Sequence, residues 1–426
     1  MDSEHRHGQP GPVWAQGGQA ELAPEIVITG RIFAGSARNQ FDGWIRIRDG
    51  KIDGLGEGAP PTASRGSMVF NAGPRTVMPG LVDAHVHLAG FARGKLTVPG
   101  DAYRFATEAL DVAHGLHQTL QAGITTVRDC GYPRHSIFAV RQAIDRSVIA
   151  GPHLVLCGRA IAVSGGHGAD LGVEADGEDG IRRAARIEMR AGADWLKLMA
   201  TGGTATPNEA VSDVQMTACE ISAAVDEAHR RGRRVCAHAS NSLGAHLCVT
   251  AGVDSIEHGI DLDQQDADLM AARGVWLSPT LACAVVESES TADDAVPGYV
   301  TEKAKEILDR HRASFQRALA AGVKIAASTD AGPPYFPLSG ASIARELRTM
   351  AALGMPAGQV LQAATAGGAE MLGTDGEVGS LRPGLAADVL VVDGDAFADV
   401  GAVESPWLVL KAGSVVRGEE HACIAQ

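Results

Sequence analysis

The middle of this 426-residue chain alternates short apolar segments with longer amphipathic ones, and this restricts the fold more than any other feature. The short segments fit buried strands, and the longer ones repeat apolar residues at helical spacing. Four of the expected helices end in an Ala-Gly pair: Ala122-Gly123, Ala191-Gly192, Ala251-Gly252 and Ala321-Gly322. A glycine there is a common helix end. The pattern therefore predicts repeated strand–helix units and a parallel sheet.

We expect eight strands in this region, at 81–87, 125–129, 153–158, 195–199, 235–239, 255–259, 275–280 and 325–330. The helices between them are expected at 103–122, 135–150, 178–191, 217–231, 242–251, 263–273 and 302–321. Eight such units indicate a (β/α)8 TIM-like barrel. The alternative is a doubly wound sheet. That fold predicts a glycine-rich phosphate loop after an early strand, and the sequence has none in that context.

Both ends of the chain are β-rich instead. Strands are expected at 24–35, 68–78, 385–393 and 407–416, and two more flank an Asp-Gly turn at 49–50. We therefore expect one small β-sandwich domain built from both chain ends, with the barrel inserted between its halves. The expected limits are 1–23 for a disordered tail, 24–79 and 380–420 for the β-sandwich domain, and 80–379 for the barrel.

Composition excludes several classes of protein. The formal net charge of −14 argues against non-specific nucleic-acid binding, which needs a basic surface. Seven cysteines, an odd number without a Cys-x-x-Cys pair, favour reduced core thiols over disulfides or a zinc–thiolate site. The first 23 residues lack the apolar run of a signal peptide, and no stretch reaches the ~20 apolar residues of a membrane span. We expect a cytoplasmic protein that forms a homo-oligomer.

The first strand of the expected barrel ends in two histidines, His85 and His87. Side chains two apart on a strand point to the same face, so both imidazoles can meet one metal ion. Polar side chains also end four later strands: Lys197, His238, His258 and Asp330. Active sites of such barrels lie at the C-terminal ends of the strands. Six metal-capable residues therefore fall where the fold would place an active site.

Lys197 stands among apolar neighbours, in the run Trp195–Met199. Burial of a charged lysine without a partner is costly, so we expect burial to lower its pKa and make the amine nucleophilic. The alternative is a lysine that reaches a surface carboxylate.

Three motifs in combination carry a resemblance to a family: Pro79–His87 (PGLVDAHVH), Ser255–Gly259 (SIEHG) and Ser328–Asp330 (STD). With Lys197 and His238, they resemble the metal-dependent amidohydrolase superfamily over about residues 25–415. The chain is most similar to the branch with a carboxylated lysine and two metals. That branch contains imidazolonepropionase-like proteins and Xaa-Pro and Xaa-Arg dipeptidases.

The resemblance implies two divalent metal ions, with zinc the natural choice and manganese or cobalt as replacements. Lys197 would react with carbon dioxide to give a carbamate that bridges both ions. His85, His87 and Asp330 would hold the more buried ion, and His238 and His258 the other. A hydroxide shared by the ions would attack the scissile carbonyl. Asp330 would carry the proton to the leaving amine as general base.

Several further residues are candidates for substrate contact. In related dipeptidases a Gly-Gly-His-Gly loop helps to hold the substrate, which points to His167 as a catalytic hydrogen-bond donor; the alternative is an exposed histidine in a glycine-rich turn. Gly202 and Gly203 follow Lys197 and permit close backbone approach. Tyr335 and Phe336 lie in a proline-rich loop after Asp330, where they could form a pocket wall.

Other segments allow two readings. Arg128 and Asp129 end the second strand and form either an ion pair that braces the barrel mouth or a substrate contact. Residues 286–301 form an acidic loop, which is either a lid that favours cationic or neutral substrates or a solvated loop. Many dipeptidase relatives carry a tyrosine soon after the fifth-strand histidine, whereas Ser240 and Asn241 stand here. This departure favours a bulkier or modified substrate.

The sequence therefore predicts a binuclear metal-dependent hydrolase that cleaves an amide bond in a small molecule or peptide. Candidate substrates are a dipeptide, an N-acyl amino acid, a lactam, or a peptide natural product that is trimmed. One alternative keeps the metals but cleaves a cyclic imidazolone-type amide, an ester or a phosphoester. Another is a non-catalytic scaffold, which predicts a missing ligand, and none is missing.

Overall fold

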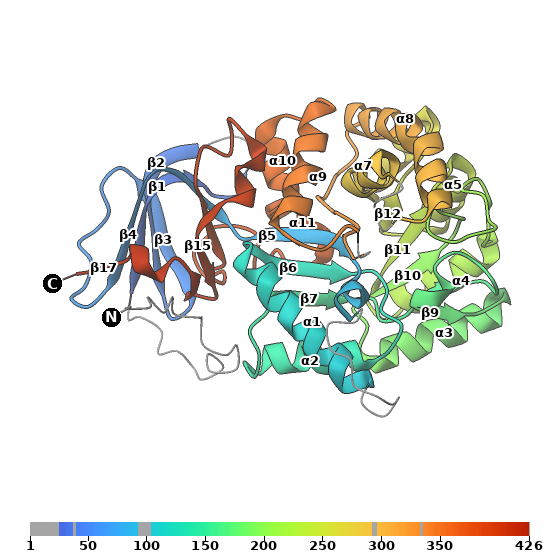
Figure 1. Ribbon diagram of the computed structural model, residues 1–426, viewed down its shortest axis with the longest axis horizontal. Helices are drawn as coiled ribbons and strands as arrows, with labels where there is room; N and C mark the ends of the chain where they lie inside the picture. Colours follow the sequence, from blue (N-terminus) through green and yellow to red (C-terminus); the bar gives the residue numbers. More distant parts are fainter. Residues whose placement is uncertain (1–24, 37–39, 93–103, 292–295, 333–334, 426) are drawn as a thin grey trace, which may run out of the picture.

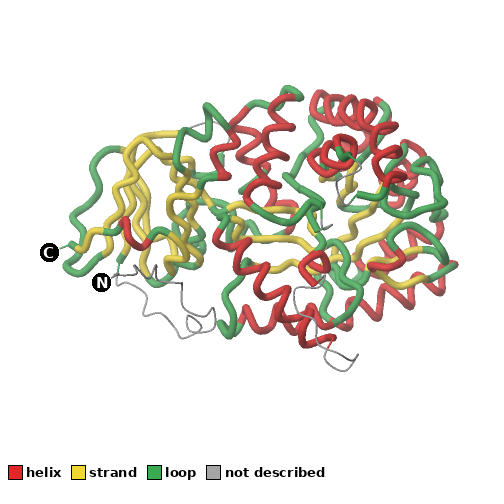
Figure 2. Tube along the Cα trace, viewed as in Figure 1, coloured by secondary structure: helices red, strands yellow, loops and turns green. Residues whose placement is uncertain are grey.

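The computed structural model describes residues 25–36, 40–92, 104–291, 296–332 and 335–425. A β-sheet region with both chain ends lies beside a larger region of strands and helices (Figures 1 and 2). The expected tail at 1–23 lies outside the described residues.

Both ends of the chain contribute to one eight-stranded sheet. Its strands are β1 (Ile26–Phe33), β2 (Gln40–Arg48), β3 (Lys51–Glu57), β4 (Met68–Pro79), β14 (Val389–Val392), β15 (Pro406–Lys411), β16 (Ser414–Arg417) and β17 (Cys423–Ile424). Their order is β16-β15-β14-β4-β1-β2-β3, with β17 also on β4. At the predicted turn, Asp49 and Gly50 both have positive φ, which a tight hairpin requires. Strands from both ends of the chain therefore join in one sheet, as expected, whereas the β-sandwich and the domain limits stay predictions.

The strands of the middle region pair in parallel. One sheet contains β5 (Leu81–Val86), β6 (Ile124–Asp129) and β7 (His153–Leu156). The other contains β8 (Ala160–Ala162), β9 (Gly172–Glu174), β10 (Trp195–Met199), β11 (Arg234–Ala239), β12 (Ser255–His258) and β13 (Trp276–Ser278). Seven of the eight expected strands are thus present, and the parallel α/β arrangement is confirmed.

The eighth expected strand, 325–330, is not a regular strand. It forms isolated parallel bridges, from Ile325 to Leu277 of β13 and from Ala331 to Val86 of β5. Backbone hydrogen bonds also join it to both strands, such as that from the Ala84 amide to the Ala327 carbonyl at 3.0 Å. The segment therefore lies between β13 and β5 and places Asp330 beside the end of β5.

The predicted helices are present as α1 (Arg104–Gln121), α2 (Ser136–Asp145), α3 (Gly177–Ala191), α4 (Ala218–His229), α5 (Ser242–Ala251), α6 (Gln264–Arg273) and α8 (Gly298–Ala320). Four further helices were not predicted from the sequence: α7 (Leu281–Glu289), α9 (Gly340–Ala352), α10 (Ala357–Ala363) and α11 (Ala366–Leu372). Short 3-10 turns occupy Leu88–Ala92, Ala169–Leu171, Val400–Glu404 and Glu419–His421. Helices surround the parallel strands in Figure 1.

The prediction of an acidic loop at 286–301 is wrong in part. Residues 286–289 complete α7, and α8 begins at Gly298. The apolar residues of α7 and its buried Glu287 pack inward, so this stretch is a helix and not a solvated loop. Residues 292–295 lie outside the described residues.

All seven cysteines are free; five are buried, as expected, whereas Cys219 and Cys423 are exposed. Across the described ranges, no helix has the length and apolar character needed to cross a membrane.

Candidate active site

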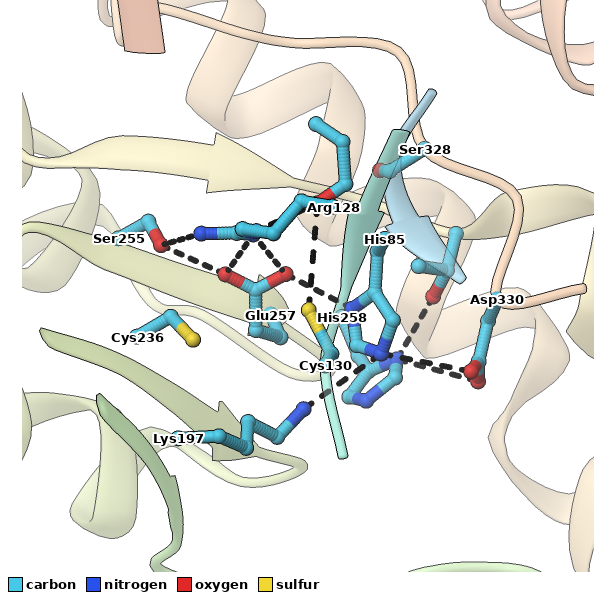
Figure 3. A network of polar contacts seen from close by, with 12 residues as sticks. His85, Arg128, Cys130, Lys197, Cys236, Ser255, Glu257, His258, Ser328 and Asp330 are labelled. Atoms are coloured by element: carbon cyan, nitrogen blue, oxygen red, sulfur yellow. Dashed lines mark hydrogen bonds and ion pairs between the residues drawn. The ribbon is translucent and has the colours of Figure 1, made fainter. Parts of the chain in front are cut away.

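Four of the predicted metal ligands converge at the C-terminal ends of the strands. The Nε2 atoms of His85 and His87 lie 3.4 Å apart. Oδ1 of Asp330 lies 3.4 Å from Nε2 of His85 and 3.3 Å from Nε2 of His87. Nζ of Lys197, which is 1% exposed, lies 3.5 Å from Nε2 of His85. Figure 3 shows Lys197 and Asp330 approaching His85 from two sides.

These separations fit the coordination shell of one divalent ion. Imidazole and carboxylate ligands bind zinc at about 2.0–2.2 Å, so neighbouring ligand atoms around it lie roughly 3–3.5 Å apart. The donor set, with imidazole nitrogens and a carboxylate, is also suitable chemically.

His238 and His258 complete the predicted set beside this group. Nε2 of His238 donates to the Gly202 carbonyl at 3.1 Å, which leaves Nδ1 as a lone-pair donor for a metal. Nδ1 of His258 contacts the Thr280 hydroxyl at 2.7 Å, which leaves Nε2 of His258 as the atom that can bind a metal. Burial holds the pKa of both histidines well below the usual range. Both rings are therefore neutral, as metal ligation requires.

Three residues at the strand ends adopt left-handed backbone conformations without being glycine. His258 has φ 67°, Thr280 has φ 51° and Asp330 has φ 56°. Such conformations cost of order 1–3 kcal/mol each and concentrate at functional sites. At His258 the backbone departs from the alternation of β12, so that Glu257 and His258, although adjacent, both contact His85. The left-handed backbone at His258 thus allows two adjacent residues, Glu257 and His258, to contact His85.

A charged network that the sequence did not predict lies behind His85 (Figure 3). Oε2 of Glu257 lies 2.7 Å from Nδ1 of His85, and one nitrogen of Arg128 donates to both oxygens of Glu257 at 2.8 Å. All three side chains are fully buried. Burial raises the pKa of Glu257, but Arg128 and His85 outweigh it and hold that pKa well below its usual range. An ionised Glu257 fixes the proton of His85 on Nδ1 and leaves Nε2 free.

The expected ion pair between Arg128 and Asp129 is wrong. Successive strand residues point to opposite faces, and Arg128 turns to Glu257. Asp129 instead accepts backbone hydrogen bonds from Leu88 at 2.8 Å and Gly131 at 3.1 Å. It therefore holds the turn that follows His87.

The expected lowering of the Lys197 pKa is also wrong. Burial does lower it, but the neighbouring thiols of Cys130 and Cys236 and the carboxylates of Glu257 and Asp330 raise it, and the net pKa is above its usual value. The sequence shows only the apolar neighbours of Lys197 along its own strand. The negative groups come from other strands.

A cavity of about 370 Å³ opens onto the predicted ligands. His167 lines it, and its ring packs against that of His238 at a tilt of 34°, with centroids 4.4 Å apart. Nδ1 of His167 lies 2.6 Å from Glu209. Burial raises the pKa of Glu209, but its contacts with His167, Gly203 and Gln215 together outweigh burial, and the net pKa is lowered. The buried, oriented ring of His167 differs from the exposed histidine of the alternative reading.

The other candidates for substrate contact divide into two groups. Tyr335 lines the cavity, whereas Phe336 is 5% exposed and packs in the hydrophobic core. Gly202 accepts from His238, and Gly203 packs against the ring of His167, where an added Cβ would lie 2.4 Å from Cε1. The two glycines thus support His238 and His167.

Two carboxylates of the site were not predicted from the sequence, Glu209 and Glu257. Glu257 belongs to the SIEHG motif, and its place two residues after Ser255, on one face of the strand, was an available signal. Glu209 comes from a loop, and no local pattern marks it. Glu287 was expected only as part of the acidic stretch at 286–301, whereas it lies in helix α7.

Known proteins resemble this chain over most of its length. A family model described as the amidohydrolase family matches residues 76–418. An ochratoxinase from Aspergillus niger is 28% identical, and the match covers 93% of this chain and 88% of the relative. The crystal structure of that organism's ochratoxinase has a TM-score of 0.79 at 26% identity and covers 93% of this chain and 96% of its own. A crystal structure of a Xaa-Pro dipeptidase with methionine in its active site has a TM-score of 0.81 at 29% identity. The match covers 92% of this chain and 99% of the dipeptidase chain.

The family match confirms the resemblance found in the sequence motifs. Members of this family generally use divalent metal ions, which agrees with the donor set described above. These relatives imply a TIM-barrel with an additional domain, in line with the parallel strands and the separate sheet. The chain therefore belongs to the amidohydrolase family, and it is a hydrolytic enzyme that acts on carbon–nitrogen bonds.

Proposed function

We propose that this enzyme is a binuclear metal-dependent amidohydrolase that cleaves an amide or peptide bond. The observation that carries the proposal is the convergence of donor atoms from separate strands. Atom-to-atom distances of 3.3–3.5 Å link His85, His87, Lys197 and Asp330, and His238 and His258 lie beside this group. We further propose that the two parallel sheets and segment 324–331 form a closed (β/α)8 barrel.

In this proposal His85, His87 and Asp330 hold one ion, and His238 and His258 hold the other. Lys197, once carboxylated by carbon dioxide, would supply an anionic group that helps to hold both ions. When bound, two divalent ions, for which zinc is the natural choice, activate water at neutral pH and polarise the scissile carbonyl. Asp330 accepts the proton from the attacking water and delivers it to the leaving amine.

His167 has the position of a substrate-orienting donor. Its Nδ1 is engaged by Glu209 and by the Thr206 hydroxyl at 3.1 Å, so Nε2 is the nitrogen that remains for the substrate. When the ring carries a proton on both nitrogens, Nε2 can donate to the developing negative charge on the carbonyl oxygen.

The test is a substrate screen with zinc-loaded protein in bicarbonate buffer. A mixed library of dipeptides and N-acyl amino acids would be incubated with the enzyme, and mass spectrometry would identify every amine released. Asp330→Asn protein is the blank. Cleavage by the native enzyme alone would support the proposal. Absence of cleavage, with two metals bound per chain, would refute hydrolysis of these simple amides and would favour a larger or modified substrate.

A further inference from the structure

A buried carboxyl that the proposed reaction leaves unused lines the active-site cavity. Glu287 lies in the last two turns of α7, is 4% exposed and shares the cavity with Asp330 and His238. The hydroxyl of Tyr335 donates to its Oε1 at 2.9 Å, and Tyr335 also lines the cavity. The carboxyl is therefore held in one orientation at the wall where a substrate would bind.

Glu287 has no partner of opposite charge in the described part of the chain. Burial raises its pKa to about 7, although hydrogen bonds from Tyr335 and Thr204 lower it. Glu289, two residues later on the same helix, is exposed and pairs with Arg345. A buried acidic group without a cation is unfavourable for stability, so its retention in a binding cavity points to a ligand.

Apart from the predicted metal ligands, the cavity lining favours a positive ligand over a negative one. Among its described residues, the cationic side chains are Lys197 and histidines, and no arginine is present. The acidic ones outside the metal set are Glu287 and, at the rim, Asp170. Ala284, Val300 and Ile307 supply apolar surface near α7, which lowers the local dielectric and strengthens an ionic contact.

We infer that Glu287, oriented by Tyr335, binds an ammonium group of the substrate, so that the enzyme prefers amides with a free amine over their N-acylated counterparts. The inference rests on the proposed amidase function and narrows its substrate class. The ammonium has two possible sources, the α-amino group of a peptide or the side chain of a lysine.

The test compares kcat/KM for matched substrates with zinc-loaded enzyme. One arm is a dipeptide with a free amino group, the second is its N-acetyl derivative, and the third is an N-acetyl dipeptide whose first residue is lysine. The enzymes are native protein, Glu287→Gln and Tyr335→Phe, with Glu289→Gln as the matched control on the same helix. If kcat/KM is raised only for the dipeptide with a free amino group, Glu287 binds the α-amine. If the N-acetyl dipeptide with lysine has a similar kcat/KM, a side-chain amine is sufficient.

We expect native enzyme to prefer an ammonium substrate by roughly tenfold or more, the effect of one charged hydrogen bond. Glu287→Gln should remove that preference, so that the ratio of kcat/KM between the free-amine and N-acetyl substrates falls to about one. Tyr335→Phe should weaken the preference in part, and Glu289→Gln should keep it. The inference is overturned if native enzyme shows no preference, or if Glu287→Gln lowers all arms equally.

A binding measurement separates this result from failure of the amidase proposal. If no dipeptide is cleaved, the proposed function fails on these substrates, and calorimetry then compares phenylalaninamide with N-acetylphenylalaninamide. Tighter binding of the free amine by native protein, lost in Glu287→Gln, would support the ammonium site by itself. Equal binding of the two amides would overturn it.

Discussion

The carboxylate of Glu257 lies 2.7 Å from Nδ1 of His85, and Arg128 holds both of its oxygens at 2.8 Å. Nε2 of His85 lies 3.4 Å from Asp330 and 3.5 Å from Lys197. Glu257 therefore controls the orientation and protonation of a residue at the centre of the site. Partners of this kind raise the metal affinity of a histidine.

Replacement of this carboxylate should therefore weaken metal binding. We expect Glu257→Gln to lower zinc affinity about 10- to 100-fold, the usual effect of losing such a partner. Competition with a coloured chelator would measure the affinity. The exposed Glu370, which pairs with Lys324, provides the control Glu370→Gln. Equal zinc affinity in Glu257→Gln and native protein would contradict this role.

Asp330 should be needed for turnover more than for folding. Its side chain contacts His85 and His87, and these contacts hold its pKa well below the usual range despite burial. Loss of a general base typically costs about 10²–10⁴ in rate. We expect Asp330→Asn to reduce kcat by that factor and to keep the circular dichroism spectrum of the native enzyme. Retention of more than about a tenth of native kcat would exclude the assigned role.

The proposed carbamate on Lys197 leads to a prediction of chemical rescue. Lys197→Ala should lose nearly all activity because the anion between the two ions is missing. A short carboxylic acid such as propionate can occupy the vacated space and should restore part of the activity, with a dependence on its concentration. Native enzyme prepared without bicarbonate should also be less active until bicarbonate is added. An alanine variant as active as the native protein would rule out the bridging lysine.

The close contact between Gly203 and His167 can be tested by one methyl group. An added Cβ would lie 2.4 Å from Cε1 of His167, so the ring must move. We expect Gly203→Ala to lower kcat/KM by roughly tenfold or more, because small displacements of positioned groups are costly in catalysis. Gly376→Ala is the control, since nothing lies within 4 Å of its added Cβ. The same kcat/KM in both variants would show that His167 does not act on the substrate.

The pH dependence of stability should report on Glu287. Burial raises its pKa from 4.5 to about 7, so the folded protein binds more protons than the unfolded chain between these values. The contribution of this group to stability is therefore complete below about pH 4.5 and is lost as pH rises to about 7.

Relative to Glu287→Gln, native protein should lose stability from pH 5 to pH 7, by no more than about 1.4 kcal/mol per pH unit. Above pH 8 the difference should be constant. Urea unfolding at four pH values would measure the free energy of unfolding. Glu289→Gln is the reference, and its free energy of unfolding should change with pH in the same way as that of native protein. Parallel curves for Glu287→Gln would mean that the carboxyl is not buried in solution.

Most of the architecture is predictable because it depends on local pattern. The His85-x-His87 strand end, the Ala-Gly helix ends and the β-rich termini are short-range signals, and each is found where it was expected. The strand at 325–330 is an exception. Asp330 takes a left-handed backbone conformation there, and the segment bonds to its neighbours only through isolated bridges.

The charged groups around the predicted ligands could not be derived in the same way. The raised pKa of Lys197 and the pairing of Arg128 with Glu257 depend on side chains that meet across different strands. Glu287 reaches the cavity only because residues 281–289 fold as a helix. Sequence spacing fixes which face of a strand a residue occupies, but not which side chain faces it across the barrel.

The number of metal ions bound per chain most directly tests the proposal that the active site is binuclear. Protein reconstituted with zinc and bicarbonate would be freed of excess ions, and its metal content per chain measured by inductively coupled plasma mass spectrometry. We predict two zinc ions per chain in native protein, and one or fewer in Lys197→Ala, where the bridging ligand is absent. One ion or none in native protein, with hydrolysis unaffected by a strong chelator, would contradict the binuclear site.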